Sequence, residues 1–349
     1  MNRSLGSRRF TLKVEDLRPK MKAILQMKAM ACMGYGPPEV LQILEVQKPE
    51  PEADEIVIRV RATTVTSGDW RIRSLEMPPG FGLLARLIFG LTKPRQPILG
   101  SEVAGEVEAM GDKVATFQPG DRVVAFDGAK MGGHAEFKAI KAAGCVVALP
   151  EDIDFETAAA LPFGGTTALH FLRKTAVRDG EKVLVIGASG SVGSAIVQIA
   201  SHRGAKVTGV CGSSNVDLVR SLGAEHVVDY SKQSVLSLGP RFDVVFETVG
   251  SLNLSQTITL LRNGGRAAMI SGGLANTIFA MLWGKSRGFK VVAGPAEERV
   301  EDLREILDLT VTKAFRPVID STYAFEEIPR AHLRVQGGRK RGNVVVTIG

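Results

Sequence analysis

Residues 182–193 read Lys-Val-Leu-Val-Ile-Gly-Ala-Ser-Gly-Ser-Val-Gly, and this stretch decides the fold. A short apolar run ends at Gly187, and two more glycines follow at intervals of three residues, Gly190 and Gly193. Apolar residues at helical spacing come next, from 195 to 200. The pattern predicts a buried strand, a tight turn and the start of a helix. Such a turn lets backbone N–H groups approach a pyrophosphate, and the helix N-terminus adds partial positive charge.

This turn supplies the first group of residues that we expect to bind a dinucleotide. They are Gly187, Ala188, Ser189, Gly190, Ser191, Val192 and Gly193. The glycine spacing departs from the commonest dinucleotide fingerprint. A glycine-rich turn that binds no ligand is therefore the alternative, and the rest of the chain has to decide between them.

The pattern on either side of the turn indicates two domains. Between about residues 151 and 288, strand-like and helix-like segments alternate, which implies a parallel sheet with right-handed crossovers. The expected strands are 182–187, 206–211, 226–228, 242–247 and 266–271, and the expected helices are 191–203, 215–222 and 252–262.

Residues 27–150 instead show short strands separated by turn signals, which predicts a small, mostly antiparallel β-barrel. The expected strands there include 56–62, 103–107 and 123–126. Residues 289–349 return to a helix at 300–309 and strands at 317–322 and 343–348. The fold class is therefore α/β, with a nucleotide-binding domain at 151–288 inserted into a β-domain made of 27–150 and 289–349.

Charge is concentrated at the N-terminus. The chain of 349 residues has a formal charge of +7, of which +5 lies in the first 26 residues. We expect residues 1–26 to be a disordered extension in a cytoplasmic protein, with a mitochondrial transit peptide as the alternative. The near-neutral remainder argues against nucleic acid as a partner. No apolar run reaches the roughly 18 residues of a membrane span, and the three cysteines form no disulfide framework.

Five motifs, in this order, resemble the medium-chain dehydrogenase/reductase superfamily, in particular its zinc-free quinone oxidoreductase branch. They are YGPPEVL at 35–41, GSEVAG at 100–105, PGDRV at 119–123, ASGSVG at 188–193 and RPVID at 316–320. The resemblance covers nearly all of 27–349. It implies a GroES-like β-barrel catalytic domain, a Rossmann domain with a doubly wound parallel sheet, and an active-site cleft between them.

The zinc-containing alcohol dehydrogenases of the superfamily differ from this chain at their ligand positions. The resemblance places Ser101, Thr66 and Phe163 where those enzymes have zinc ligands, and the four-cysteine structural zinc lobe is absent from the sequence. Zinc requires three or four nitrogen, sulfur or carboxylate ligands held together. We therefore expect no bound zinc or other metal.

The second strand of the parallel sheet is followed by hydroxyl and amide side chains. Ser213, Ser214 and Asn215 stand where an NAD-specific domain has a carboxylate that binds the ribose, and Tyr230 follows further on. A carboxylate would repel a 2′-phosphate, whereas these side chains can donate to it. The prediction is NADPH as cofactor; the alternative is that Ser214 or Asn215 only caps the next helix.

The resemblance also implies contacts from the ends of other elements. The cofactor-binding residues expected on this ground are Thr167, Val249, Ser271, Gly272 and Asn343. For the glycine, ordinary turn chemistry at a strand end is the alternative.

Without zinc, the favoured acceptors are those that take hydride readily, quinones and α,β-unsaturated carbonyls. Their developing negative charge needs hydrogen-bond donors. The catalytic candidates are Thr66, Asp69 and Tyr35, with the alternative that Asp69 caps a helix and pairs with Arg71 or Arg73.

Two apolar segments, 80–91 and 274–283, are expected to line a pocket for a small apolar carbonyl or quinone; core packing or a homodimer interface is the alternative. The predicted function is a zinc-independent, NADPH-dependent oxidoreductase acting on a quinone or α,β-unsaturated carbonyl. Two further hypotheses stay open: an NADPH-binding protein resembling zeta-crystallin with a non-catalytic or RNA-binding role, and an enoyl-thioester reductase.

Overall fold

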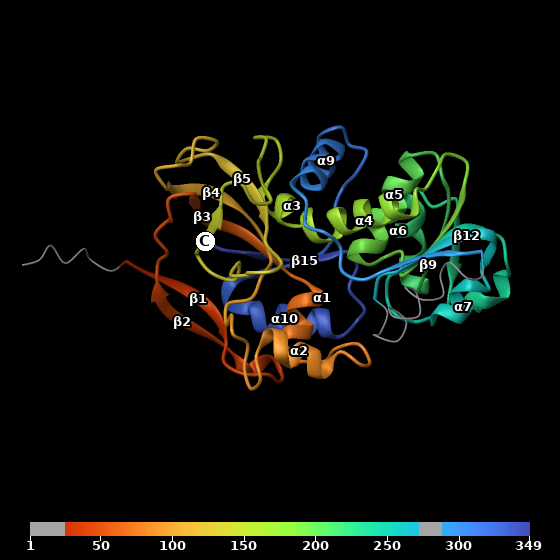
Figure 1. Ribbon diagram of the computed structural model, residues 1–349, viewed down its shortest axis with the longest axis horizontal. Coiled ribbons are helices and arrows are strands. Elements are labelled where there is room, and N and C mark those ends of the chain that lie inside the picture. The colour runs from red at the N-terminus through yellow and green to blue at the C-terminus, as the bar shows by residue number, and fades with distance from the viewer. Residues whose placement is uncertain (1–24, 272–287) are drawn as a thin grey trace, which may run out of the picture.

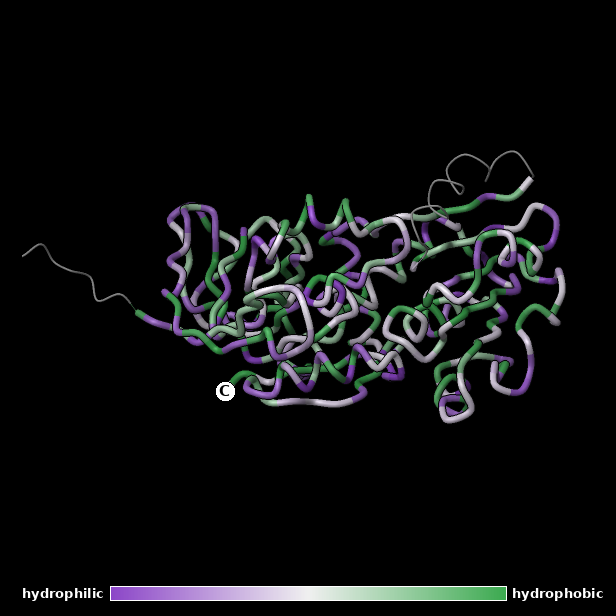
Figure 2. The backbone as a smooth tube through the Cα atoms, turned by 90° about the horizontal axis from the view of Figure 1, so that it is seen from below, coloured by the Kyte–Doolittle hydropathy of each residue, from purple (hydrophilic) through white to green (hydrophobic). Residues whose placement is uncertain are grey.

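The computed structural model describes residues 25–271 and 288–349. Two lobes lie along the long axis of the molecule, one built on a mostly antiparallel sheet and one on a parallel sheet (Figure 1). Hydrophilic residues follow the outlying loops at both ends of that axis (Figure 2). Within the described residues, no helix is long and apolar enough to cross a bilayer.

The first lobe contains a seven-stranded sheet in the order β14-β15-β3-β4-β5-β7, with β6 paired to β3, and a separate β1-β2 pair. The central strand β3 is rich in β-branched residues, and its pairing with three neighbours buries most of its side chains. This lobe fits the expected GroES-like barrel. Its strands are β1 Gln26–Cys32, β2 Leu41–Gln47, β3 Glu55–Val65, β4 Glu102–Met110, β5 Arg122–Phe126, β6 Phe137–Lys141, β7 Val146–Ala148, β14 Ile319–Ala324 and β15 Asn343–Thr347. Its helices are α1 Ser67–Ser74, α2 Gly82–Phe89 and α10 Ile328–Gln336, with 3₁₀ turns η2 Pro38–Val40 and η5 Phe325–Glu327.

The second lobe is a six-stranded parallel sheet in the order β10-β9-β8-β11-β12-β13. Numbered from its first strand this is 3-2-1-4-5-6, the order of a Rossmann fold, and the order reverses between β8 and β11. Its strands are β8 Lys182–Ile186, β9 Lys206–Cys211, β10 His226–Asp229, β11 Phe242–Glu247, β12 Leu261–Met269 and β13 Lys290–Ala293. Its helices are α4 Pro162–Thr175, α5 Ser191–His202, α6 Val216–Ser221, α7 Leu254–Ile258 and α9 Val300–Val311, with 3₁₀ turns η3 Ser213–Asn215 and η4 Val235–Leu238.

The hydrophobic core is continuous between the lobes. Ala104 and Val124 of the antiparallel sheet belong to the same buried cluster as Phe171 of α4 and Val185 of β8. The short helix α3 (Phe155–Ala159) contributes to this cluster at the junction of the lobes. Because this packing buries apolar surface from both sides, it fixes where the two sheets meet.

Three expected boundaries are wrong. The helix expected at 252–262 is only α7, and β12 begins at Leu261, five residues before the strand expected at 266–271. A register shift at the start of the β11–β12 pairing accommodates the Asn-Gly-Gly stretch that hid this strand start. The strand expected at 317–322 runs instead from Ile319 to Ala324.

The domain boundary expected at residue 289 also differs from the observed pairing. Strand β13 pairs with β12 in parallel, and α9 packs against α4. Residues 290–311 therefore lie with the parallel sheet, and the chain rejoins the antiparallel sheet at β14.

Candidate active site

The turn after β8 has a conformation that glycine alone accepts without strain. Gly187 has φ +82°, and a Cβ there would lie 2.5 Å from Oγ1 of Thr248. A Cβ on Gly193 would lie 2.1 Å from the carbonyl oxygen of Gly187. These two glycines therefore allow the first turn of α5 to pack directly against the end of β8.

Helix α5 begins at this turn, at the carboxyl end of the sheet where the strand order reverses. Its N-cap residue is Gly190, which offers no side chain to the first-turn N–H groups. These groups have no partner within the helix, and the helix dipole adds positive potential. The arrangement fits a pyrophosphate, which is the group that the sequence predicts here.

The C-terminal strand ties this turn to the antiparallel lobe. The Gly342 N–H donates to the carbonyl of Ser189 at 2.8 Å, and Oγ of Ser191 donates to Oδ1 of Asn343 at 2.5 Å. The amide of Asn343 donates in turn to the carbonyl of Val318 at 3.1 Å. Asn343 is thus a buried brace beside the turn.

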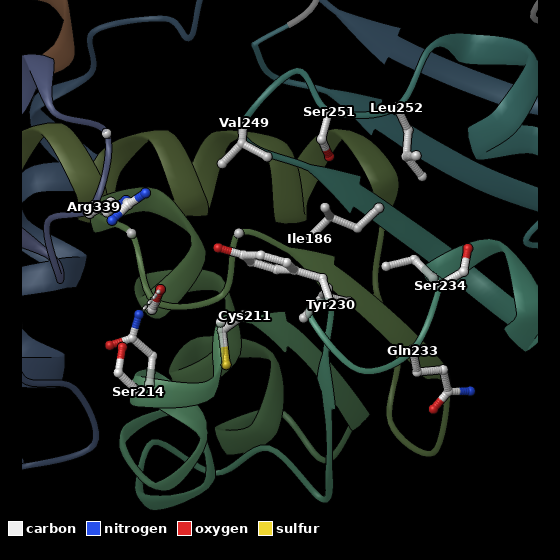
Figure 3. A pocket seen from close by; sticks show the side chains of 18 of the residues that line it. Ile186, Cys211, Ser214, Tyr230, Gln233, Ser234, Val249, Ser251, Leu252 and Arg339 are labelled. Atoms are coloured by element: carbon white, nitrogen blue, oxygen red, sulfur yellow. Dashed lines mark hydrogen bonds between the residues drawn. The ribbon is translucent and has the colours of Figure 1, made fainter.

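A cavity of about 620 Å³ lies over the turn. In Figure 3 the Tyr230 ring crosses the middle of this cavity, between Val249 and Cys211. The expected residues that line it are Gly187, Ser189, Gly190, Ser214, Asn215, Tyr230 and Val249. The lining residues that sequence reasoning missed are Ile186, Val210, Cys211, Gly212, Gln233, Ser234, Val235, Leu236, Ser251, Leu252, Gly338, Arg339 and Lys340. Arg339, Lys340 and Arg341 are consecutive basic residues in the sequence, which was the available signal for that wall.

The other expected cofactor residues lie outside this lining. Ala188, Ser191, Val192, Gly193 and Ser213 belong to the turn and the β9 loop beneath it, and Thr167 is buried in α4. Ser271 lines a second cavity, and Gly272 lies outside the described residues.

A carboxylate that the sequence reasoning overlooked lies beside Ser213. Asp229, at the end of β10, accepts hydrogen bonds from Oγ of Ser213 at 2.5 Å and Oγ of Ser231 at 2.7 Å. These hydrogen bonds hold the pKa of Asp229 below its usual value. Nζ of Lys232 lies 3.7 Å from the same carboxylate. Because β9 and β10 are parallel neighbours, Asp229 lies beside the loop that follows β9 although the two are distant in sequence.

On the wall of the first cavity, Lys340 is partly buried. Burial lowers the pKa of its ammonium group to about 8. Its Nζ donates to the carbonyl of Gly342, so the side chain is held at the junction of the two lobes. The site therefore contains a cation whose charge depends on pH near neutrality.

The second cavity, of about 380 Å³, lies where α1 and α2 face the ends of β12 and β13. The expected apolar segment 80–91 contributes to its wall, while 274–283 lies outside the described residues. Arg71 is the one charged side chain among the described residues of the lining, which are Arg71, Met77, Pro78, Phe81, Leu84, Ala85, Ile88, Phe89, Met269, Ile270, Ser271, Gly294 and Pro295.

Arg71 is held over the Trp70 ring, 5.9 Å from its centroid. Burial lowers the pKa of its guanidinium group. Within residues 25–271 and 288–349, no carboxylate forms an ion pair with it. The cavity therefore combines an apolar lining with one cation available to an oxygen of a bound molecule.

The three catalytic candidates form structural contacts. Thr66 and Asp69 are the two halves of a capping box that begins α1, and the buried Asp69 carboxylate accepts from the N–H of Thr66 at 2.7 Å and of Gly100 at 2.9 Å. Oη of Tyr35 donates to the carbonyl of Gly90 at 2.7 Å. None of the three is among the described residues that line either cavity, so a direct catalytic role finds no geometric support.

The alternative pairing of Asp69 with Arg71 or Arg73 is not observed among the described residues. Arg73 is fully buried, and it donates to the carbonyl of Gly36 and to Oε1 of Gln336. Arg71 turns to the second cavity instead. The carboxylate of Asp69 instead caps helix α1, as the alternative for this residue expected.

Glu102 is a buried carboxylate between the lobes. It accepts hydrogen bonds from the Thr64 hydroxyl and, at 2.5 Å, from the N–H of Phe163 at the start of α4. Burial raises the pKa of this carboxyl to about 8. The sequence signal for this residue was an acidic side chain within the mostly apolar stretch 99–104. Among the described residues that line the two cavities, Lys340 is the one whose charge acts on the Glu102 carboxyl.

The side chains beside Glu102 do not fit zinc. Ser101, Thr66 and Phe163 offer two hydroxyls and no ring nitrogen, thiolate or carboxylate. In the described part of the chain, no three histidine, cysteine, aspartate or glutamate side chains gather as a metal site would require.

Comparison with known proteins agrees with this architecture. The family description "Alcohol dehydrogenase GroES-like domain" matches residues 52–151, and "Zinc-binding dehydrogenase" matches residues 222–346. The quinone oxidoreductase of Mus musculus is 34% identical over 339 residues, covering 92% of this chain and 98% of that protein. The chain belongs to the medium-chain dehydrogenase/reductase superfamily, in its quinone oxidoreductase-like branch.

Other members of the superfamily give the same picture. The NADPH-dependent alkenal/one oxidoreductase of Arabidopsis thaliana chloroplasts is 28% identical over 334 residues, covering 92% of this chain and 79% of that protein. The structure of the quinone oxidoreductase from Coxiella burnetii superposes with a TM-score of 0.82 at 24% identity, covering 93% and 100% of the two chains. Membership of this dehydrogenase/reductase superfamily supports an oxidoreductase and implies a nicotinamide cofactor.

Proposed function

We propose that this oxidoreductase transfers hydride from NADPH to a quinone or an α,β-unsaturated carbonyl, without a metal. The observation that carries the proposal is the second cavity, which is apolar and has Arg71 as its charged group among the described residues. The names of the mouse and Arabidopsis relatives support both acceptor classes. Ser101, Thr66 and Phe163, at the positions where the zinc enzymes have metal ligands, support a reaction without zinc.

The preference for NADPH rests on the β9 loop and the basic wall of the first cavity. The loop after β9, where an NAD-specific domain has its ribose-binding acid, contains Ser213, Ser214 and Asn215 instead. Both oxygens of the neighbouring Asp229 already accept hydrogen bonds from serines. Arg339 and Lys340 line the same cavity and favour an additional phosphate. The Arabidopsis relative is named as NADPH-dependent.

NADPH, when bound, supplies the hydride, and the protein supplies binding and electrostatics. The apolar wall of the second cavity excludes water from the acceptor. The Arg71 guanidinium is placed to stabilise negative charge on the acceptor oxygen, the role that a metal has in the zinc enzymes. A proton from solvent completes the reduced product.

The test is NADPH oxidation with a panel of quinones, enones, enoyl thioesters and simple aldehydes. We expect turnover with quinones and enones and little with aldehydes. Arg71→Met should lower kcat for the good acceptors about 10²-fold, the usual effect of removing one charge-stabilising donor, and Arg71→Lys should retain part of the rate. Equal rates in the wild type and Arg71→Met would refute the role of Arg71, and turnover of enoyl thioesters alone would favour that reductase class.

A further inference from the structure

Helix α2 exposes an unusual amount of apolar surface. Of its eight residues, Leu83 is 74% exposed, Leu87 is 54% exposed and Ile88 is 55% exposed. Leu84 on the same helix is 43% exposed, and Leu91, just after the helix ends, is 63% exposed. Single exposed aliphatic residues are ordinary, but five on one short segment form a patch of the kind that marks an interaction surface.

The charged residues of the segment that carries this patch are all of one sign. From residue 77 to residue 101 the sequence contains no aspartate or glutamate. Arg86, Lys93 and Arg95 lie within it and are all exposed. Figure 1 shows α2 at the lower margin of the molecule. Exposed aliphatic side chains flanked by basic residues are the composition of helices that lie at the surface of an anionic membrane.

The patch is continuous with the second cavity. Leu84 and Ile88 belong to both, being exposed on α2 and also part of the cavity lining. A molecule dissolved in the lipid that contacts α2 would therefore meet the cavity without crossing water.

We propose that α2 docks on the surface of a lipid bilayer that carries anionic headgroups, with the leucines inserted at the boundary of headgroups and acyl chains. Lipophilic acceptors then enter the second cavity from the membrane side. Docking itself stands apart from the proposed function; only the route of entry rests on it.

The basic residues argue against a second copy of this chain as the occupant. In a two-fold symmetric contact the same patch faces itself, so Arg86, Lys93 and Arg95 would approach their own equivalents without an acidic residue between 77 and 101 to compensate them. Anionic headgroups supply the missing negative charge.

The test is co-sedimentation of the full chain with vesicles of phosphatidylcholine alone and of three parts phosphatidylcholine to one part phosphatidylglycerol. We expect binding to the anionic vesicles that weakens as salt is raised. Leu83→Glu and Leu87→Glu should each lower the bound fraction on the order of tenfold. Neither residue lines the second cavity, so turnover of a water-soluble quinone should not change.

The matched control is Leu333→Glu, because Leu333 on α10 is 54% exposed, as Leu87 is. The basic first 26 residues are the same in all variants, so they do not produce a difference among them. Failure of the wild type to sediment with anionic vesicles, or an equal loss in Leu333→Glu, would overturn the proposal. So would a mass in solution that halves in Leu87→Glu, which would make α2 a contact between copies. Weaker vesicle binding by Leu83→Glu and Leu87→Glu, with quinone turnover unchanged, would support the role of α2 in docking. Absence of quinone turnover in the wild type and every variant would instead contradict the proposed function.

Discussion

Ser191 and Asn343 join the two lobes at the cofactor turn, with Oγ of Ser191 donating to Oδ1 of Asn343 at 2.5 Å. The two residues are far apart in sequence, and both are buried. The contact places the first residue of α5 against the first residue of β15. The antiparallel lobe therefore helps to hold the glycine turn of the parallel lobe in place.

Replacing Asn343 by alanine should loosen this turn. The substitution leaves the buried Ser191 hydroxyl without its acceptor, while the Val318 carbonyl keeps the backbone N–H of residue 343. An unsatisfied buried polar group costs about 1–3 kcal/mol. We expect lower stability in denaturant and a weaker Kd for NADPH by roughly tenfold. Asn263→Ala, at an exposed position, is the control. An unchanged Kd in Asn343→Ala would show that the brace is not needed for binding.

Gly193→Ala should damage the turn more severely. Its Cβ would lie 2.1 Å from the carbonyl oxygen of Gly187, which is backbone and has little room to move. Displacing α5 from the turn should abolish measurable NADPH binding in a fluorescence titration. Gly337→Ala, where the nearest atom lies at 3.6 Å, should bind normally. Normal binding by Gly193→Ala would mean that the first turn of α5 does not contact the cofactor.

Affinity for NADPH should fall as pH rises through about 8. Burial lowers the pKa of Lys340 to about 8, so the cation on the cavity wall is present below that pH and lost above it. A titration of Kd between about pH 7 and pH 9 should show the loss in the wild type. Lys340→Met should bind more weakly at the lower pH and show a flatter profile. If Kd depends on pH as weakly in the wild type as in Lys340→Met, Lys340 does not contribute to NADPH binding.

Glu102→Gln should change how stability depends on pH. Burial raises the pKa of Glu102 from 4.5 to about 8, so the folded protein prefers the protonated carboxyl. The stability that this preference contributes is complete below about pH 4.5 and is lost as pH rises towards 8, at up to about 1.4 kcal/mol per pH unit.

Glutamine keeps an acceptor for the Phe163 N–H and does not titrate. The free energy of unfolding of Glu102→Gln should therefore exceed that of the wild type by a margin that grows from pH 5 to pH 8. A margin that stays constant from pH 5 to pH 8 would show that Glu102 does not titrate in this range in the folded protein.

The sequence predicted the parallel lobe well because its signals are local. The apolar run before Gly187 and the helical pattern after it lie within one short stretch, and the observed β8 and α5 match them within a residue or two. The start of β12 was missed because Asn263, Gly264 and Gly265 resemble a turn, whereas the pairing with β11 accommodates them in a strand.

The active site was harder to predict because its contacts join distant segments. Asp229 reaches Ser213 through the pairing of β10 with β9, and Arg71 of α1 lines the second cavity with residues of α2 and the ends of β12 and β13. A helix cap at Asp69 was open as an alternative from the sequence, and the structure shows it as a capping box with Thr66. No pattern in a single chain shows which polar side chain turns inward.

The most direct test of the account compares NADPH and NADH in steady-state reduction of a quinone by metal-stripped protein. The account predicts full activity after chelation, no stoichiometric zinc by elemental analysis, and kcat/KM at least about tenfold higher with NADPH, a difference of about 1.4 kcal/mol. Activity that returns only when zinc is restored, equal kcat/KM for the two nucleotides, or tight NADPH binding without turnover of any quinone or enone would contradict it.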